Sequence, residues 1–224
     1  MSIDLAQFTS PHQVRLVDDQ LLLVDGQPFH CQGEIGRGKS AISWRFSNGE
    51  QQLTVKRYTQ VAHNLIPFEQ ALGFELLSYQ RMQQAGVACP QLVGFCAASY
   101  LLVKEYIKGP VVIDLIARDM MDDRLLRRGY AYAEQLKRAG FHVDYFPANF
   151  VVKGGELYCI DYEAHPYLAE WDFHHWGVFY WLNSEGVKGY LADGDIRHLN
   201  KPDSFKPWDE PFIARRDALA SSLG

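Results

Sequence analysis

Hydrophobic and polar residues alternate with a period of two between residues 42 and 58. Ile42, Trp44 and Phe46 each stand between polar or basic neighbours, which is typical of a half-buried strand. Asn48-Gly49 is a hairpin turn signal, and Leu53 and the residues after it resume the extended pattern. The sequence therefore predicts two strands joined by a tight turn over this region.

A helical period follows. Residues 67–87 place Phe68, Leu72, Leu76 and Tyr79 on one side of a helix, and residues 111–139 read as two helices that Gly140 ends. Between these segments, residues 91–110 predict two strands that run into a linker. Residues 1–30 contain QLLLVDGQPF, which predicts a further hairpin. The C-terminal tail, residues 201–224, has three prolines and few core-forming runs, so we expect it to wrap the preceding helices or to fray.

The composition is that of an ordered globular protein, with 47% hydrophobic and 13% aromatic residues. A net charge of −5 argues against a nucleic-acid binder, because there is no basic excess to neutralise phosphates. The basic residues between 124 and 138 are expected to form the solvated face of a helix. Four cysteines show no C-x-x-C spacing, and no signal peptide or membrane-spanning run is evident. We therefore expect a soluble cytoplasmic protein without membrane or nucleic-acid partners.

The stretch GEIGRGKS, residues 33–40, fits two phosphate-binding motifs. From Gly33 it satisfies the P-loop of the NTPases, which needs a buried strand before it and a helix beginning at Lys39-Ser40. From Gly36 it is the opening of a glycine-rich hairpin, with Gly38 second and Ala41 at the third glycine position. The flanking residues predict strands and no helix, which favours the hairpin.

Two charged residues downstream of this hairpin are candidates for an ion pair. Lys56 lies in the strand LTVKRY, after Val55. The helix predicted over residues 67–87 offers two carboxylates, Glu69 and Glu75. Glu75 is the preferred partner because it lies in the middle of the helix, and Glu69 is the alternative.

The segment HVDYFPANFVVKGGELYCIDYE, residues 142–163, combines a D-x-x-x-x-N spacing with a predicted hairpin. Asp144 and Asn149 form the spacing, and Lys153-Gly154-Gly155-Glu156 forms the turn. The hairpin should carry Asn149 and Asp161 back to the same point. An amide and a carboxylate placed together suit Mg²⁺, while a second carboxylate can accept a proton.

Taken in their order along the chain, these motifs resemble those of the protein-kinase-like superfamily over roughly residues 30–182. The resemblance implies a two-lobed α+β fold, with an antiparallel N-lobe sheet and one helix and then a reduced helical C-lobe. The chain would be a single domain over residues 1–224, with an N-lobe at about 1–103, a hinge at 104–110 and a C-lobe at 111–224. It also implies ATP and Mg²⁺ as cofactors.

The resemblance assigns roles to residues of this chain. Asp144 would be the catalytic base, with Asn149 and Asp161 completing the catalytic set as Mg²⁺ ligands. The expected nucleotide-binding residues are Gly36, Gly38, Lys56, Glu75, the Glu105 carbonyl and the Ile107 amide. The segment EWDFHHWGVFYW similarly implies that Asp172 hydrogen-bonds the catalytic-loop backbone, and we expect its two histidines to pack rather than to bind metal.

The sequence also departs from the pattern of conventional protein kinases. Only residues 162–171 separate Asp161 from Asp172, where those kinases place a long activation segment. Phe146 stands where they place a lysine, a charge that Lys39 is a candidate to replace. Lys104 falls at a usually apolar position behind the adenine pocket.

With these departures the chain resembles minimal atypical kinases such as the RIO kinases, the p53-related small kinases and the lipopolysaccharide kinases. The run Ile160-Asp161-Tyr162-Glu163 is similar to that of choline and aminoglycoside kinases. We expect an atypical serine/threonine protein kinase. The alternatives are a kinase of small molecules and a nucleotide-binding pseudokinase.

Overall fold

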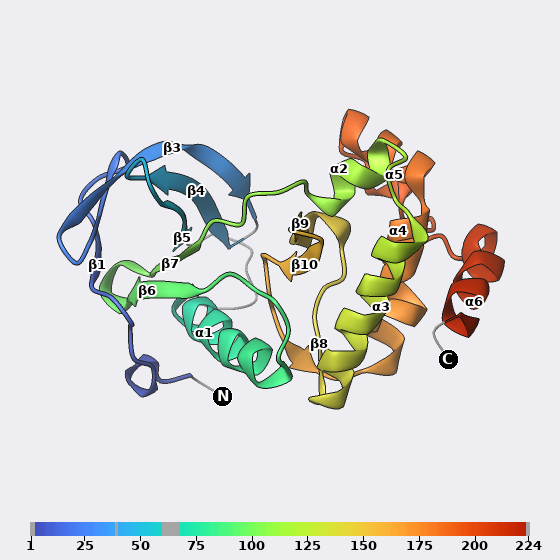
Figure 1. Cartoon of the computed structure of the whole chain (residues 1–224), viewed down its shortest axis with the longest axis horizontal. Helices are drawn as coiled ribbons and strands as arrows, with labels where there is room; N and C mark the ends of the chain where they lie inside the picture. Colours follow the sequence, from blue (N-terminus) through green and yellow to red (C-terminus); the bar gives the residue numbers. More distant parts are fainter. Residues whose placement is uncertain (1–2, 39, 60–67, 223–224) are drawn as a thin grey trace. The chain divides into compact units, whose positions relative to one another are not determined.

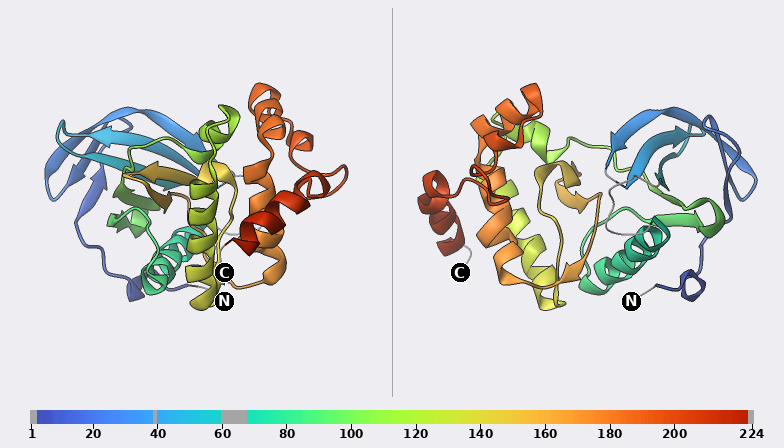
Figure 2. Two further views of the ribbon diagram at one scale, coloured as in Figure 1. Left: turned by 45° about the vertical axis from the view of Figure 1, so that its right-hand side comes forward. Right: turned by 180° about the vertical axis from the view of Figure 1, so that it is seen from behind.

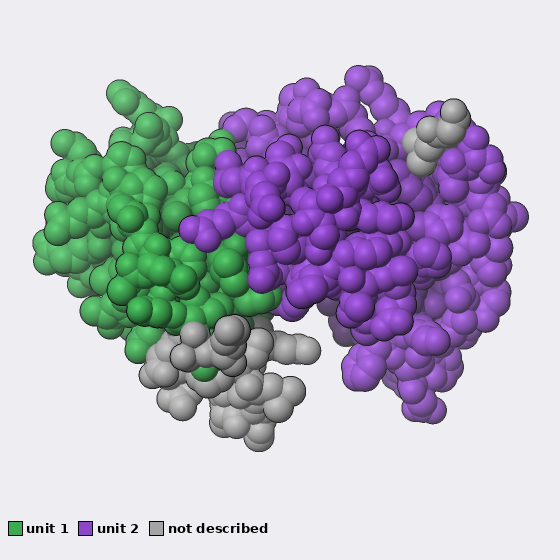
Figure 3. Space-filling model, turned by 90° about the horizontal axis from the view of Figure 1, so that it is seen from below, with its two compact units in different colours: residues 1–79, 90–106 green, residues 80–89, 107–224 purple. Residues whose placement is uncertain are grey.

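The computed structural model describes residues 3–38, 40–59 and 68–222, without the side chains of residues 68 and 69. The chain forms two compact units (Figure 3). Unit 1 consists of Met1–Tyr79 and Pro90–Tyr106, and unit 2 of Gln80–Cys89 and Ile107–Gly224. Together they are a mixed α+β protein with a large antiparallel sheet. Across the described ranges, no helix combines the length and the apolar character needed to cross a membrane.

Unit 1 is built on a seven-stranded antiparallel sheet (Figure 1). In spatial order its strands are β1 (Val14–Leu16), β2 (Leu21–Val24), β3 (Gln27–Arg37), β4 (Ala41–Ser47), β5 (Gln52–Tyr58), β7 (Leu101–Glu105) and β6 (Leu92–Cys96). The hairpins predicted before residue 30 and over residues 42–58 are confirmed, as are the two strands after residue 91.

The described residues of the GEIGRGKS stretch form strand and turn. Its residues end β3, and β4 begins immediately after the turn, at Ala41. The Gly38 N–H donates to the Ala41 carbonyl at 2.9 Å, and Ser40 forms a bend rather than the first turn of a helix. Since a P-loop requires a helix at this point, the P-loop alternative is excluded.

The two faces of the sheet pack differently. One face buries a hydrophobic cluster that includes Phe46, Val55 and Val103. The other is covered by α1 (Phe68–Ala85), which packs Leu72 and Leu76 against strand residues of the sheet (Figure 2). The helix predicted over residues 67–87 is thus confirmed. It packs on the sheet face that carries Tyr58 of β5, and side chains at every second position of β5 lie on that face.

Unit 2 holds the remaining helices and two small sheets. Its α-helices are α2 (Val112–Ala117), α3 (Asp123–Arg138), α4 (Val178–Leu182), α5 (Ser184–Asp193) and α6 (Ile213–Ser221), with a π-helix at Phe173–Gly177. The hairpin predicted around Gly154-Gly155 is confirmed as β9 (Phe150–Lys153) and β10 (Glu156–Cys159). A second pair joins β8 (Phe141–His142) to β11 (His165–Pro166).

Short 3-10 helices complete both units. They lie at Leu5–Gln7, Ala97–Ser99, Pro147–Asn149, Ala169–Trp171, Ile196–His198 and Glu210–Phe212.

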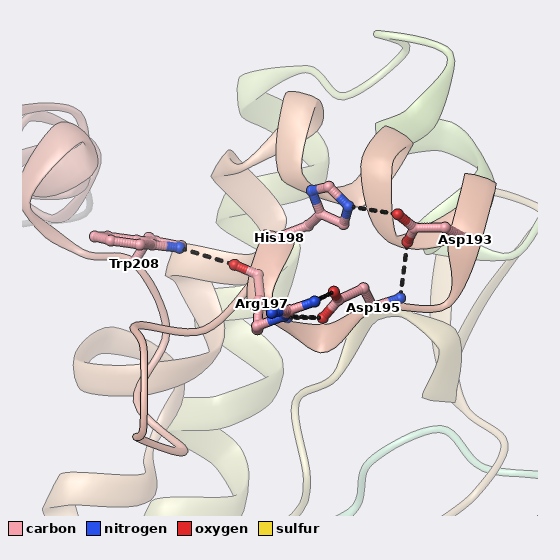
Figure 4. Close-up of polar contacts among 5 residues, drawn as sticks. All are labelled: Asp193, Asp195, Arg197, His198 and Trp208. Atoms are coloured by element: carbon pink, nitrogen blue, oxygen red, sulfur yellow. Dashed lines mark hydrogen bonds and ion pairs between the residues drawn. The ribbon is translucent and has the colours of Figure 1, made fainter.

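The C-terminal tail is more regular than its sequence indicates. Asp193, the last residue of α5, accepts from the Asp195 N–H at 2.8 Å and contacts the ring of His198 at 2.9 Å (Figure 4). Arg197 pairs with Asp195, and its carbonyl accepts from Trp208 Nε1 at 3.3 Å. These local polar contacts fix the segment, and a helix follows it within unit 2.

Gly177, the last residue of the π-helix, provides a test of packing in unit 2. A Cβ added there would lie 2.4 Å from the Cβ of Tyr145, which is too close for either residue to accommodate by side-chain rotation alone. Gly177→Ala should lower the free energy of unfolding by about 2 kcal/mol, as overpacking usually does. Urea unfolding measures this change.

Gly36→Ala is the matched control, because its added Cβ would meet nothing within 4 Å. Equal stability of Gly177→Ala and this control would contradict the close packing of Gly177 on Tyr145.

Candidate functional site

The glycine-rich hairpin presents open backbone. Gly36 and Gly38 are exposed at the β3–β4 turn, and a Cβ added at Gly36 would meet nothing within 4 Å. The lack of side chains lets a ligand approach the main chain closely, as phosphate binding requires. Lys39, the candidate for an extra positive charge, lies outside the described residues.

A buried ion pair links β5 to α1. Lys56 Nζ lies 2.8 Å from Glu75 Oε2, and the side chains of Lys56 and Glu75 are 11% and 4% exposed. This is the pair expected from the sequence. The side chain of the alternative, Glu69, lies outside the part that the structure describes. Buried charges are costly unless they are paired, so this contact fixes α1 against the sheet.

Two further donors reach the same carboxylate, and neither was expected from the sequence to contact Glu75. Lys104 Nζ donates to Glu75 Oε1 at 2.8 Å, and the Tyr58 hydroxyl donates to Glu75 Oε2. Strand register explains the convergence. Lys104 pairs across the sheet with Thr54, so it lies on the same face as Lys56 and Tyr58, which follow Thr54 at every second position of β5.

The electrostatics of this cluster favour an ionised glutamate. Burial raises the pKa of Glu75, but the charges of Lys104 and Lys56 outweigh it and lower the pKa from 4.5 to about 2. Hydrogen bonds from the two lysines act in the same direction. Glu75 is therefore a carboxylate throughout the physiological range.

The two expected adenine-binding positions lie at the end of β7 and just after it. Glu105 is the last residue of β7, and its N–H donates to the Gln91 carbonyl at 2.9 Å. Ile107 is buried in unit 2. Their role in binding a base stays a prediction.

In unit 2, Asp144 and Asn149 are joined directly. Asn149 Nδ2 donates to Asp144 Oδ2 and to the Asp144 carbonyl, both at 3.2 Å. The Phe146 N–H donates to Asp144 Oδ1 at 3.0 Å, so both carboxylate oxygens are oriented. Because the Asn149 amide uses its nitrogen in this way, its oxygen is the atom suited to a cation.

The hairpin brings Asp161 to the same place. Cys159 pairs with Phe150 at the base of β9–β10, and the Ile160 N–H donates to the Asn149 carbonyl at 2.8 Å. Asp161 is exposed. An amide oxygen and an accessible carboxylate fit Mg²⁺, which usually keeps several waters and takes few protein ligands. The donor set therefore suits the metal that the resemblance implies.

The environment of Asp144 suits a base. Burial among surrounding protein atoms raises its pKa, and the nearby charge of Asp161 acts in the same direction, while hydrogen bonds from Phe146 and Asn149 oppose them. The net effect is a raised pKa, although the residue as a whole is exposed. A carboxylate with a raised pKa is a stronger proton acceptor than an ordinary aspartate.

The loop around Asp144 is held by aromatic packing. The ring of Phe146 packs edge-to-face on Tyr180 and on Tyr190, with centroids 5.5 and 5.9 Å apart. Trp181 Nε1 donates to the Tyr145 carbonyl at 2.9 Å. The position where protein kinases place a lysine is thus part of an apolar cluster.

The role expected for Asp172 is wrong. Its carboxylate caps the π-helix, accepting from the His175 N–H at 2.8 Å, and it also accepts from the Tyr167 hydroxyl at 2.8 Å. Among the described residues it makes no hydrogen bond to the backbone of residues 142–149, the loop that carries Asp144. A short acidic side chain directly before a helix is a favoured N-cap, and Asp172 has this capping role here.

No family model matches the chain, and no curated protein matches it. What the chain does must therefore be inferred from the geometry of the two units.

The pKa of Glu75 predicts how stability changes with acid. Above its ordinary value of 4.5 the carboxylate is ionised in the folded and unfolded states, and its stabilisation is complete. As the pH falls below 4.5, the unfolded state takes up a proton first, and the stabilisation is lost as the pH approaches about 2. Its full extent is roughly 3 kcal/mol.

Urea unfolding of wild type and of Glu75→Gln at a series of pH values measures this loss. The stability difference between them should shrink as the pH falls, since glutamine does not titrate. Glu50→Gln, at an exposed turn position, is the control. If the free energy of unfolding of wild type exceeds that of Glu75→Gln by the same amount at every pH, Glu75 does not titrate as described.

Proposed function

We propose that the protein is a Mg²⁺- and ATP-dependent phosphotransferase with a kinase-like fold. In this proposal unit 1 is the N-lobe and binds the nucleotide, while unit 2 is the C-lobe and carries the catalytic residues. The γ-phosphoryl group of ATP would pass to a hydroxyl group of an acceptor.

The observation that carries the proposal is the arrangement of three residues in unit 2. Asp144 is oriented by two donors and has a raised pKa, and Asn149 is bonded directly to it. Asp161 follows the residue that hydrogen-bonds Asn149. Phosphoryl transfer needs a base for the acceptor hydroxyl and ligands for the metal that neutralises the phosphates. These residues offer both in one place.

Each side chain has a defined task in this mechanism. Asp144 would orient the acceptor hydroxyl and take its proton. Asn149 and Asp161 would hold Mg²⁺, which supplies positive charge to the phosphate oxygens. In unit 1, Lys56 would bind the phosphates, with Gly36 and Gly38 offering backbone N–H groups.

The preferred acceptor is a serine or threonine of a protein. One observation favours a small molecule instead. The segment between Asp161 and Asp172 is short, and its residues are held by contacts within unit 2. β11 pairs with β8, and the Ala164 carbonyl accepts from Arg81 Nη1 at 2.5 Å. No extended segment that could support a peptide is found between these two aspartates.

Incubation of the pure protein with Mg²⁺ and γ-labelled ATP tests the proposal. The arms are the protein alone, a generic protein substrate and a panel of hydroxylated metabolites. Transfer of label to a protein supports the first acceptor, and transfer to a metabolite supports the second. Tight Mg-ATP binding without transfer in any arm would favour the pseudokinase alternative.

Asp144→Asn should lower the rate of transfer by roughly 10²–10⁴-fold, the usual contribution of a general base. Nucleotide affinity should change little, because Asp144 acts on the acceptor. The wild-type rate should also fall as the pH drops through the raised pKa of Asp144, and the variant should lack this dependence. A variant with the wild-type rate would disprove the assigned role of Asp144.

Asp161→Asn should weaken Mg-ATP binding and abolish turnover, because a neutral amide is a poorer ligand for a hard divalent cation. Isothermal titration calorimetry measures the affinity with Mg²⁺ and with EDTA. Asp203→Asn, at an exposed position in the tail, is the control. Unchanged Mg²⁺-dependent affinity in Asp161→Asn would remove Asp161 from the metal site.

A further inference from the structure

Glu75 receives more hydrogen bonds than an ion pair with Lys56 requires. Oε1 accepts from Lys104, whereas Oε2 accepts from both Lys56 and Tyr58. If Lys56 turned to another anion, Oε1 would keep Lys104 and Oε2 would keep Tyr58. Neither oxygen of this buried carboxylate would be left without a donor, and the usual cost of breaking a buried ion pair would be largely avoided.

The two lysines differ in access to solvent. The side chain of Lys104 is 3% exposed and that of Lys56 is 11% exposed. Both bonds to Glu75 are 2.8 Å long, so distance does not distinguish them. Side-chain exposure does: Lys56 is the more exposed of these two buried lysines, so it is the one that we expect a ligand to reach.

We propose that Lys104 and Tyr58 are positioning residues that hold Glu75, so that Lys56 can transfer an ammonium hydrogen bond from Glu75 to a phosphate oxygen. The nucleotide's phosphates would then bind without releasing α1 from the sheet. This inference rests on the proposed function, which it extends with a division of labour among the donors around Glu75.

A purely structural role for Lys104 and Tyr58 makes a different prediction. If they only fill space and satisfy Glu75, their loss lowers stability and leaves anion binding as it was. If they free Lys56, their loss makes Lys56 the donor that Glu75 needs, and anion binding weakens. Affinity for a phosphate compound therefore separates the two roles, whereas stability alone does not.

The test uses the full-length protein and two probes, Mg-ATP and inorganic tripolyphosphate, with affinities measured by calorimetry. The variants are Tyr58→Phe, which removes one hydroxyl, and Lys104→Met, which replaces a charged chain by an apolar one of similar length. Tyr79→Phe is the matched control, since it removes a hydroxyl that donates to Gln91 at 3.1 Å from the same helix as Glu75. Lys56→Met marks the complete loss of the phosphate-binding ammonium.

We expect Tyr58→Phe and Lys104→Met each to lower the affinity for both probes by roughly tenfold or more, which corresponds to a hydrogen bond to a charged group. Lys56→Met should weaken them at least as much, and Tyr79→Phe should match wild type. Because Tyr58→Phe keeps the ring and both lysines, it should stay folded even if Lys104→Met does not.

Two results would overturn the inference. One is wild-type affinity for both probes in Tyr58→Phe, together with wild-type affinity in Lys104→Met where that variant folds. The other is a wild type that binds neither probe. The proposed function fails separately: if both probes bind as expected and no label moves from ATP to any acceptor, the division of labour stands and the phosphotransferase does not.

Discussion

The structure of unit 1 depends on one buried carboxylate. Glu75 is almost inaccessible to solvent, and a charge in that position is tolerated only because three donors surround it. Two of them come from β5 and one from β7, so Glu75 joins α1 to two neighbouring strands. The surrounding packing of Leu72 and Leu76 is apolar and would allow small shifts, whereas the charged contacts allow few.

In unit 2 the equivalent constraint is the orientation of Asp144. Its two carboxylate oxygens each accept one hydrogen bond, and the neighbouring Tyr145 is held by Trp181 and by the close approach of Gly177. These contacts set the position of the carboxylate before any ligand binds. Such preorganisation is what the general-base role proposed for Asp144 needs, because a small displacement costs much of the rate.

Much of this could be predicted from the sequence where local pattern decides the structure. The strands around the Asn48-Gly49 turn, helix α1 and the β9–β10 hairpin follow from periodicity and turn residues. Lys104 could not be placed in the same way, because its contact with Glu75 depends on how β5 and β7 pair and on which face α1 covers. Asp172 was expected, by resemblance, to bond a backbone elsewhere in the chain. In the structure its side chain instead caps the π-helix that follows it. Helix α6 lies in a proline-containing tail whose hydrophobic pattern is weak, so it was missed.

Binding of Mn²⁺ as a paramagnetic substitute for Mg²⁺ tests the proposed Mg-ATP-dependent function most directly. Electron paramagnetic resonance would follow Mn²⁺ with and without ATP in wild type, Lys56→Met and Asp161→Asn. We expect ATP to increase Mn²⁺ binding strongly in wild type. Both variants should lose this increase, since Lys56 is the proposed phosphate ligand and Asp161 a proposed metal ligand. Mn²⁺ binding that ATP does not alter, or an increase that survives both substitutions, would contradict the proposed binding of Mg-ATP.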